Sequence, residues 1–164
     1  MGVTMELDRK QLGNAEAGLA RLASLVADMT PVMDAIGALL VSNTQARFSE
    51  GVAPSGEKWK PSLRAELEGG QTMMDGGDLY RSIAHKASRD QVEVGTNKIY
   101  AAVHQFGATI RAKNVPFLRF KVGGRFVSKP SVTIPARPFI GFDATDKKDV
   151  EALVVSELEK RNAS

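Results

Sequence analysis

Apolar residues recur at helical spacing in two successive stretches near the start of the chain. These two stripes predict two consecutive helices, over residues 15–28 and residues 31–48. Thr30 and Pro31 predict the start of the second helix, because threonine can accept from first-turn amides and proline suits the first helical position. Residues 3–7 alternate between apolar and polar, which predicts a short strand. The two stripes consist of Leu19, Leu22, Val26 and Met29, and of Val32, Ile36, Leu39 and Leu40.

The next segment, residues 49–77, is rich in glycine and proline and has no clear periodicity. We expect it to be a flexible loop. Trp59 lies in this loop, where it either folds back onto the edge of the core, the commoner case, or serves as an exposed interface anchor. Beyond the loop we expect a helical turn from Asp78, a strand over residues 91–94, and a short helix that stops at Gly107.

Alternation over residues 115–134 predicts one long antiparallel hairpin that turns at Gly123-Gly124. Side chains alternate between the two faces of a strand, so one face should be apolar and the other positively charged. Pro130 lies within the second strand, which is therefore expected at a sheet edge or at a bulge. The apolar face is predicted to comprise Leu118, Phe120, Val122, Phe126, Val132 and Ile134, and the basic face Arg119, Lys121, Arg125 and Lys129.

A last helix is predicted over residues 146–161, with Thr145 as its N-cap and basic residues at its C-terminal end. Together the elements predict a single α+β domain over residues 1–164. It consists of two N-terminal helices, a mostly antiparallel sheet with a long basic hairpin, and a C-terminal helix. With 164 residues, the chain can bury about two thirds of its unfolded surface.

Charge is distributed unevenly along the chain, although the net charge is only +3. Residues 94–142 carry eight lysines and arginines and no acidic residue, whereas the flanking segments are mildly acidic. A basic block of this kind favours a surface that faces an anionic partner. Charge alone leaves three alternatives open: nucleic acid, an acidic protein surface, and a solvated face.

The chain contains no cysteine, which excludes a disulfide scaffold, a cysteine-based zinc site and a thiol nucleophile. We recognise no signal peptide at its start and no apolar run long enough to span a bilayer. We therefore expect a protein that is made in the cytoplasm, stays soluble and has no membrane partner.

Few residues have the spacing that catalysis or metal binding requires. Neither histidine, His85 or His104, lies in a metal-binding spacing, and His104 is expected to be hydrogen-bonded at a helix end. Asp75 and Asp78 flank two glycines, but too few oxygen ligands surround them for calcium, and a turn is the better interpretation. The sequence has no phosphate-binding loop and no nucleophile elbow. We therefore expect no enzymatic activity, catalytic residue, cofactor or metal.

Several motifs in a fixed order give the chain a resemblance to a known family. Thr30-Pro31 opens the second helix, Trp59-Lys60-Pro61 follows in the loop, and Gly77-Asp78-Leu79 comes later. The two most specific motifs are Tyr100-Ala-Ala-Val-His104-Gln105-Phe106-Gly107 and Ile134-Pro135-Ala-Arg137-Pro138-Phe139-Ile-Gly141. In this order they resemble the phage virion morphogenesis family, the tail completion proteins of Mu-like and P2-like contractile-tailed phages. The resemblance spans roughly residues 5–142 and does not include the C-terminal helix.

The resemblance implies a structural, non-enzymatic protein at the head-proximal end of the tail, where it stabilises head–tail joining. By analogy with other neck and tail-terminator proteins, we expect a homo-oligomeric ring, a hexamer that matches the tail tube. Its partners would be the tail tube or sheath, neck or connector proteins, and the phage DNA that passes through the channel. It would be a virion component at the neck, assembled in the cytoplasm of the bacterial host.

The motif residues are expected to be structural, and the cations to form an interface. Between Pro135 and Pro138 the backbone would stay extended, and Phe139 would insert into the core or, less often, into a neighbour. The cations Arg119, Lys121, Arg125, Lys129 and Arg137 would face the DNA path or an acidic neighbouring ring. The alternative function is a nucleic-acid-binding protein that contacts DNA through the basic hairpin. The structural set comprises Trp59, Tyr100, His104, Gln105, Phe106, Gly107, Pro135, Pro138 and Phe139.

Overall fold

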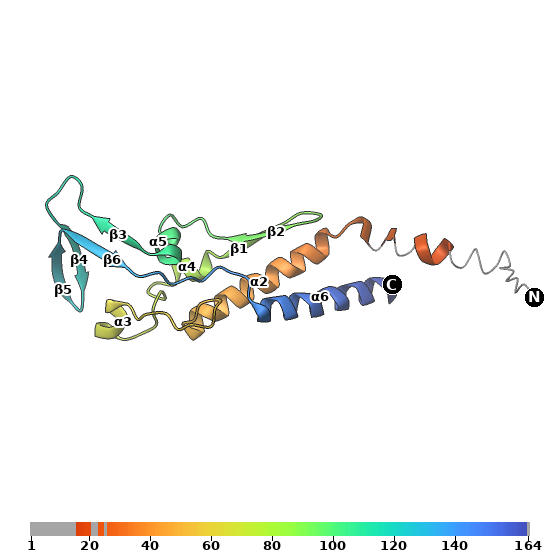
Figure 1. Cartoon of the computed structure of the whole chain (residues 1–164), viewed down its shortest axis with the longest axis horizontal. Coiled ribbons are helices and arrows are strands. Elements are labelled where there is room, and N and C mark those ends of the chain that lie inside the picture. The colour runs from red at the N-terminus through yellow and green to blue at the C-terminus, as the bar shows by residue number, and fades with distance from the viewer. Residues whose placement is uncertain (1–15, 21–22, 25, 164) are drawn as a thin grey trace, which may run out of the picture.

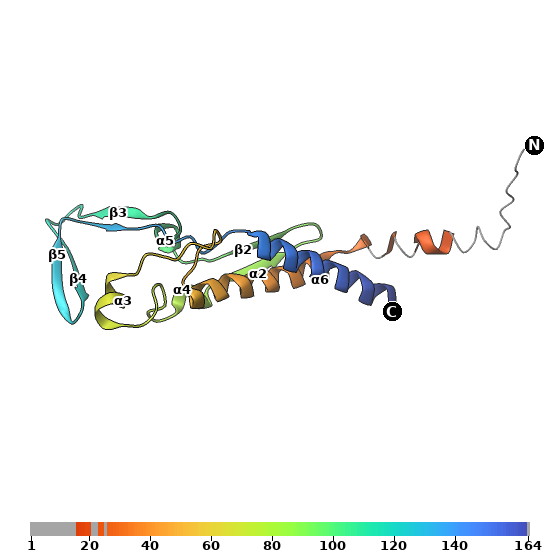
Figure 2. The same cartoon turned by 60° about the horizontal axis from the view of Figure 1, so that its bottom comes forward.

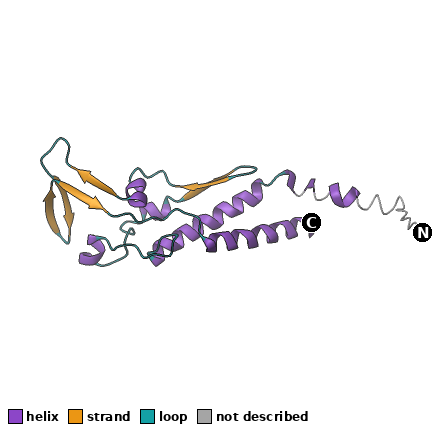
Figure 3. Cartoon of the chain, viewed as in Figure 1, coloured by secondary structure: helices purple, strands orange, loops and turns teal. Residues whose placement is uncertain are grey.

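Helix α2 (Thr30–Glu50) runs along the middle of the molecule (Figure 1). The structure is a computed structural model that describes residues 16–20, 23–24 and 26–163. The molecule is elongated, with some elements alongside α2 and others gathered beyond its C-terminal end (Figure 2). Helices and small antiparallel strand pairs are mixed along it, which confirms the predicted α+β class (Figure 3).

The first predicted helix lies partly outside the described residues. The described residues between 16 and 27 are helical, as predicted, whereas the predicted strand at residues 3–7 lies outside the described part. Helix α2 begins at Thr30 and has proline in its first turn, also as predicted. The predicted N-cap is wrong, because the side chain of Asp28 accepts the hydrogen bond from the Thr30 N–H, at 2.9 Å.

A glycine lets two strands pack directly against α2. β1 (Ala84–Ala87) and β2 (Val92–Gly95) form an antiparallel pair that lies alongside this helix (Figure 1). A Cβ at Gly37 would lie 2.2 Å from Cδ2 of His85, so no larger residue fits there without a shift. His85 also reaches Asp34 on α2, with Nε2 3.0 Å from Oδ1. Gly37 therefore allows the strand pair to pack closely against α2.

The segment predicted as an irregular loop contains a short helix. α3 (Leu63–Glu68) begins after Ser62, whose hydroxyl accepts a hydrogen bond from the Ala65 N–H at 3.2 Å. Six residues are too few to show helical periodicity in the sequence. The loop prediction for residues 49–77 is thus wrong at α3, and α4 (Asp78–Arg81) follows as the predicted helical turn.

Two further strand pairs lie at the end of the molecule that is beyond the C-terminus of α2 (Figure 1). β3 (Ala108–Arg111), which follows α5 (Ala101–Phe106), pairs antiparallel with β6 (Ser131–Ile134). β4 (Leu118–Val122) and β5 (Arg125–Lys129) form a separate antiparallel hairpin. The prediction of one continuous hairpin is therefore wrong, since its second strand is divided between two strand pairs.

Pro130 divides the predicted second strand. It has no N–H to donate, so strand pairing cannot continue through it. After Pro130 the chain leaves β4 and pairs with β3, and the Ala112 N–H donates to the Pro130 carbonyl at 3.0 Å. The turn of the shorter hairpin lies at Gly123-Gly124, as predicted, and both glycines have positive φ, 59° and 72°.

The register of the hairpin corrects the predicted position of Phe126. Val122 pairs with Arg125 across the two-residue turn. The even-numbered residues of β4 therefore share a face with the odd-numbered residues of β5. Phe126 consequently pairs with Lys121. Paired residues share a face, so Phe126 lies with Arg119 and Lys121 and not with the apolar residues.

The same register separates the four hairpin bases. Arg125 is paired with Val122, and Lys129 with Leu118, on the face opposite Arg119 and Lys121. The prediction of a single basic face is therefore wrong. Two of the four cations lie on each face of the hairpin.

α6 (Ala144–Ala163) runs back along α2 (Figure 1). Its cap is Asp143, whose Oδ1 accepts from the Asp146 N–H at 2.8 Å, while Asp146 Oδ2 accepts from the Asp143 N–H at 3.0 Å. This reciprocal pair is a capping box built from two aspartates. Thr145 was predicted as the cap and is wrong by two positions.

The core lies near the C-terminal end of α2, where α4, α5 and the motif of residues 134–141 meet. Its buried residues are Phe48, Ala53, Trp59, Leu79, Ile83, Ala101 and Phe139. None of the helices in the described ranges is long and apolar enough to cross a membrane.

Candidate functional site

The two specific motifs of the sequence lie against each other, and we call residues 104–107 together with residues 134–141 the motif junction. Gln105 joins them. Its Oε1 accepts from the Phe139 N–H at 3.0 Å and the Ile140 N–H at 3.1 Å, and its Nε2 donates to the Ile140 carbonyl at 2.8 Å. One amide side chain thus replaces the strand pairing that this extended backbone lacks.

Gly107 allows the two motifs to approach closely. Its φ is +73°, and a Cβ there would lie 2.8 Å from the Ala136 backbone nitrogen and 3.1 Å from the Ile134 carbonyl oxygen. Beside it, the Arg137 N–H donates to the His104 carbonyl at 2.7 Å. The glycine is therefore required both by its conformation and by the space available.

Aromatic packing anchors the motif junction in the core. Phe139 is 1% exposed, and its ring centroid lies 5.3 Å from that of Phe48. Trp59 packs edge-on against Phe48 and donates from Nε1 to the Pro138 carbonyl at 2.8 Å. The core positions expected for Trp59 and Phe139 are confirmed. Pro135 is half-buried, whereas Phe106 is largely exposed.

Arg137 is buried in the motif junction, which contradicts the expectation that it faces DNA or a neighbouring ring. It is 4% exposed, and its guanidinium donates to the Lys60 carbonyl at 2.7 Å and the Pro61 carbonyl at 3.1 Å. Burial also lowers the pKa of Arg137. Its role in the single chain is to fasten the second motif to the Trp59 loop.

His104 is half-buried beside Arg137. Burial, followed by the charge of Arg137, lowers the pKa of His104 below its ordinary value. Its Nδ1 is buried without a hydrogen-bond partner among the described residues, so the prediction of a hydrogen-bonded imidazole is wrong for this atom. The ring lies edge-on to Tyr100, with centroids 6.1 Å apart. This arrangement favours a neutral packing role over acid–base chemistry.

A buried ion cluster, missed in the sequence, joins α2 to α6. Arg47 is 6% exposed and pairs with Asp143, at 2.9 Å, and with Asp146. Arg47 also donates to the Gly141 carbonyl at 3.1 Å, and Asn43 donates to Asp146 at 2.9 Å. Burial raises the pKa of Asp143, but the Asp146 N–H and the Arg47 guanidinium outweigh it, so the pKa lies below its ordinary value. The sequence signal that could have indicated this cluster is the spacing of Asp143 and Asp146.

The hairpin presents cations and aromatic rings to solvent. On one face, Arg119 and Lys121 lie beside Phe126, which is 85% exposed. Phe117, at the start of the hairpin, is 48% exposed. At the turn, the Gly123 N–H donates to Glu68 Oε1 at 2.6 Å, so the hairpin is fastened to α3.

The fastened hairpin encloses a groove of about 900 Å³, which we call the arch groove. Its lining is mostly apolar, and it also contains several lysines and arginines together with Glu66. The apolar lining includes Leu63, Ile110, Leu118, Phe120, Val132 and Ile134, and the cations that line the groove include Lys60, Arg119, Lys121 and Lys129.

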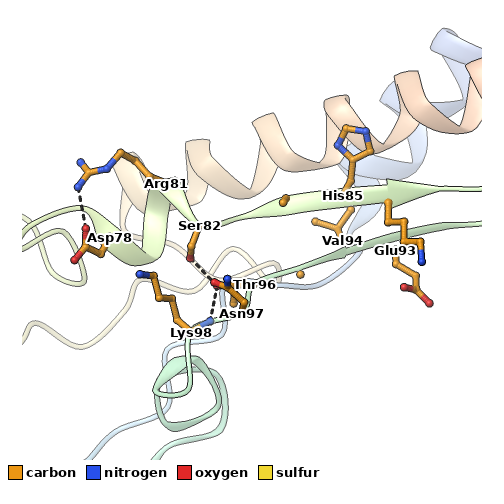
Figure 4. Close-up of a pocket in the computed structure, with 12 residues that line it drawn as sticks. Asp78, Arg81, Ser82, His85, Glu93, Val94, Thr96, Asn97 and Lys98 are labelled. Atoms are coloured by element: carbon orange, nitrogen blue, oxygen red, sulfur yellow. Dashed lines mark hydrogen bonds and ion pairs between the residues drawn. The ribbon is translucent and has the colours of Figure 1, made fainter.

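A second hollow, of about 810 Å³, lies beside α4 and the β1–β2 pair (Figure 4). Two pairs of its polar side chains bond to each other: Arg81 with Asp78 at 3.0 Å, and the hydroxyls of Ser82 and Thr96 at 2.6 Å. His85 points toward α2 and away from this hollow. We assign no chemistry to it. Within residues 16–20, 23–24 and 26–163, no group of three or more histidine or acidic side chains is placed to hold a metal.

Comparison with known proteins matches almost the whole chain. Residues 10–159 match the phage virion morphogenesis family. The Mu-like prophage FluMu G protein 2 of Haemophilus influenzae is 31% identical over 144 residues, which cover 85% of this chain and 88% of that protein. The putative capsid assembly protein G of Escherichia phage Mu is 28% identical over 159 residues, 92% of this chain and 88% of that protein. No solved structure gives a significant match.

Proposed function

The chain belongs to the phage virion morphogenesis family, and from this premise we propose that it completes the tail and stabilises head–tail joining. Membership gives it a role in the assembly of a phage virion. The phage Mu relative is named for capsid assembly, whereas the motifs resemble tail completion proteins. A position at the head-proximal end of the tail accounts for both, because a protein there touches both parts of the particle.

The observation that supports this proposal most strongly is the apolar surface that a single chain leaves exposed. Ile99 is 96% exposed, Phe126 85% and Phe106 77%. Large exposed apolar side chains that gather on one part of a protein mark interaction surfaces. These lie on or next to α5 and β5, toward the far end of the molecule (Figure 1). In this proposal, these exposed side chains contact other proteins of the particle.

The partners in this proposal include further copies of the chain in a closed ring, a hexamer. Heterologous contacts that close by rotation produce rings of this kind. One face of the ring would contact neck or connector proteins and the other the tail tube or sheath, with DNA passing through the centre. The role is structural and requires no catalysis.

A second candidate function is nucleic-acid binding through the β4–β5 hairpin. Arg119, Lys121 and Phe126 share one exposed face of this hairpin. Cations next to an exposed aromatic ring can hold phosphates and stack on bases. Arg137 contributes nothing to this surface, because it is buried.

Light scattering on the purified chain, at two salt concentrations and with or without short duplex DNA, separates the two functions. A ring held by apolar contacts should give the mass of several chains at both salt concentrations, with or without DNA. A monomer or dimer that binds DNA, with an affinity that falls steeply as salt rises, would favour the second function. A monomer that binds no DNA would contradict self-assembly and require the tail as a template.

A further inference from the structure

One face of the β4–β5 hairpin leaves an aromatic ring and two cations uncovered. Lys121 is paired with Phe126, and Arg119 with Ser128, so these four side chains share a face, which we call the outer face. All four are exposed, Phe126 to 85%. In the described part of the chain, neither Arg119 nor Lys121 forms an ion pair. An aromatic anchor flanked by free cations indicates an interface in which the ring enters a pocket and the cations meet carboxylates.

A hollow of about 530 Å³ lies where the C-terminal end of α2, the loop after it and the start of α6 meet. We call it the acidic hollow, because the carboxylates of Glu50, Asp143 and Asp146 line it against the single guanidinium of Arg47. Its volume leaves space for one phenyl ring. Small apolar side chains form much of the remaining lining, those of Ala46, Val52, Ala53, Pro54 and Ala144.

One carboxylate of the acidic hollow is free to meet a cation from outside. Asp143 and Asp146 pair with Arg47, whereas Glu50 is exposed and takes part in no ion pair within the described ranges. The hollow thus combines an apolar lining with an excess of negative charge. The outer face combines an apolar ring with positive charge, so the two surfaces are complementary.

The hairpin of the same chain is held away from the acidic hollow. None of the hairpin residues lines the hollow, and the Gly123 N–H fastens the hairpin to α3 through its hydrogen bond to Glu68 Oε1 at 2.6 Å. The hairpin lies beyond the C-terminal end of α2, whereas α6, whose first residues line the hollow, runs back along α2 (Figures 1 and 2). The outer face and the acidic hollow are therefore two separate surfaces of one chain.

We propose that the outer face of one copy binds the acidic hollow of the next copy, with the Phe126 ring in the hollow and the cations beside its carboxylates. The inference rests on the proposed ring and names a contact that holds it together. Two different surfaces of one chain make a heterologous contact, which closes into a ring when the rotation fits.

The hairpin register favours this occupant over nucleic acid. Nucleic-acid-binding surfaces gather their lysines and arginines on one face. The register instead places only Arg119 and Lys121 on the outer face and the other two hairpin cations on the opposite face. A ring with two flanking cations matches one pocket with few carboxylates better than a row of phosphates.

Disulfide trapping between two chains tests this contact, because the chain has no cysteine of its own. Ser128→Cys places a thiol on the outer face, and Ser55→Cys places one in the lining of the acidic hollow. These single variants, one of them lengthened by a tag, are mixed and mildly oxidised, so every disulfide joins two chains. The mixed dimer should be the main product on a non-reducing gel.

The matched control for trapping replaces Ser55→Cys by Ser156→Cys, at an exposed position of α6 that does not line the hollow. Mixed with Ser128→Cys, it should give few mixed dimers. Equal yields of mixed dimer with Ser55→Cys and with Ser156→Cys, or no mixed dimer with Ser55→Cys, would overturn the contact.

Charge variants distinguish failure of this contact from failure of the ring. Phe126→Asp places a negative charge where the ring would enter an acidic hollow, and it should reduce the mass in solution to that of one chain. Val155→Asp, at a 57% exposed position on α6, is the control and should leave the ring intact. If Phe126→Asp still forms a ring, the inference fails and the proposed ring stands. If the wild-type chain is a monomer without mixed disulfides, both fail, and loss of DNA binding in Phe126→Asp would then assign the outer face to nucleic acid.

Discussion

Gln105 is the residue on which the two motifs converge, since it makes three hydrogen bonds to the backbone of Phe139 and Ile140. Gln105→Ala leaves these partly buried groups without partners. We expect the free energy of unfolding to fall by about 3 kcal/mol, because each unsatisfied group costs about 1–3 kcal/mol. Urea unfolding measures the change. Gln91→Ala, at an exposed position, is the control, and equal effects of the two variants would contradict the assigned role.

Gly37 is a second residue whose identity the packing requires. Alanine favours a helix over glycine by about 1 kcal/mol, yet its Cβ would lie 2.2 Å from His85 Cδ2 and 2.9 Å from Val92 Cγ2. We expect Gly37→Ala to destabilise the protein by about 1–3 kcal/mol through overpacking, measured by thermal or urea unfolding. Gly18→Ala, with nothing within 4 Å of the added Cβ, should be neutral or slightly stabilising. A stabilising Gly37→Ala would contradict the close contact.

The stability of the fold should depend on the protonation of His104. Its folded pKa lies below the ordinary value of 6.5, so the unfolded chain binds the proton more readily than the folded chain. The stabilisation is fully present above about pH 6.5 and is lost as the pH falls from there through the folded pKa. Unfolding curves at pH 7.5 and pH 5 should show this loss, and His104→Asn should reduce it. An unchanged pH dependence in the variant would exclude His104 as the cause.

At the scale of elements, α6 is fastened to α2 by the buried ion cluster. Asp146→Ala would leave Arg47 buried with one carboxylate fewer, and removing one partner of a buried pair costs about 3–5 kcal/mol. We therefore expect a large drop in the urea midpoint. Lys148→Ala, on the exposed side of the same helix, should change it little. A small effect of Asp146→Ala would mean that apolar contacts alone hold α6.

Helices and turns with a local sequence signal could be predicted from the sequence, whereas the elements that pair or pack with them could not. Pro31 and the apolar stripe were sufficient for α2, and Gly123-Gly124 for the turn of the hairpin. The division of the hairpin at Pro130 depends on β3, which is distant in the sequence. The register of the hairpin depends on the length of the turn. Both features depend on how the strands pair in the folded chain. The periodicity along one strand carries no information about that pairing.

The candidate site was predictable to a similar extent. The motif residues were recognised, and the core positions of Trp59 and Phe139 follow from their size. The burial of Arg137 was not foreseen, because backbone carbonyls of a distant loop satisfy its guanidinium. Arg47 was missed for the same reason, since its partners lie about a hundred residues further along the chain.

At the scale of the whole molecule, the two faces of the hairpin can be tested separately. Arg119→Ala/Lys121→Ala removes the cations beside Phe126, and Arg125→Ala/Lys129→Ala removes those on the other face. Neither pair contributes to the described core, so circular dichroism should show intact folding for both. We expect the first pair to reduce the yield of infectious particles more than the second, because it carries the exposed aromatic ring. Normal yields with all four bases replaced would show that they are only solvated.

The most direct test of the proposed function is electron microscopy of particles made by a phage or prophage from which the gene for this chain has been removed. We predict DNA-filled heads and complete-length tails that remain separate, and joined particles once the chain is supplied again. Joined particles without the chain would contradict a role in head–tail joining. The absence of filled heads would instead indicate an earlier role in building the capsid.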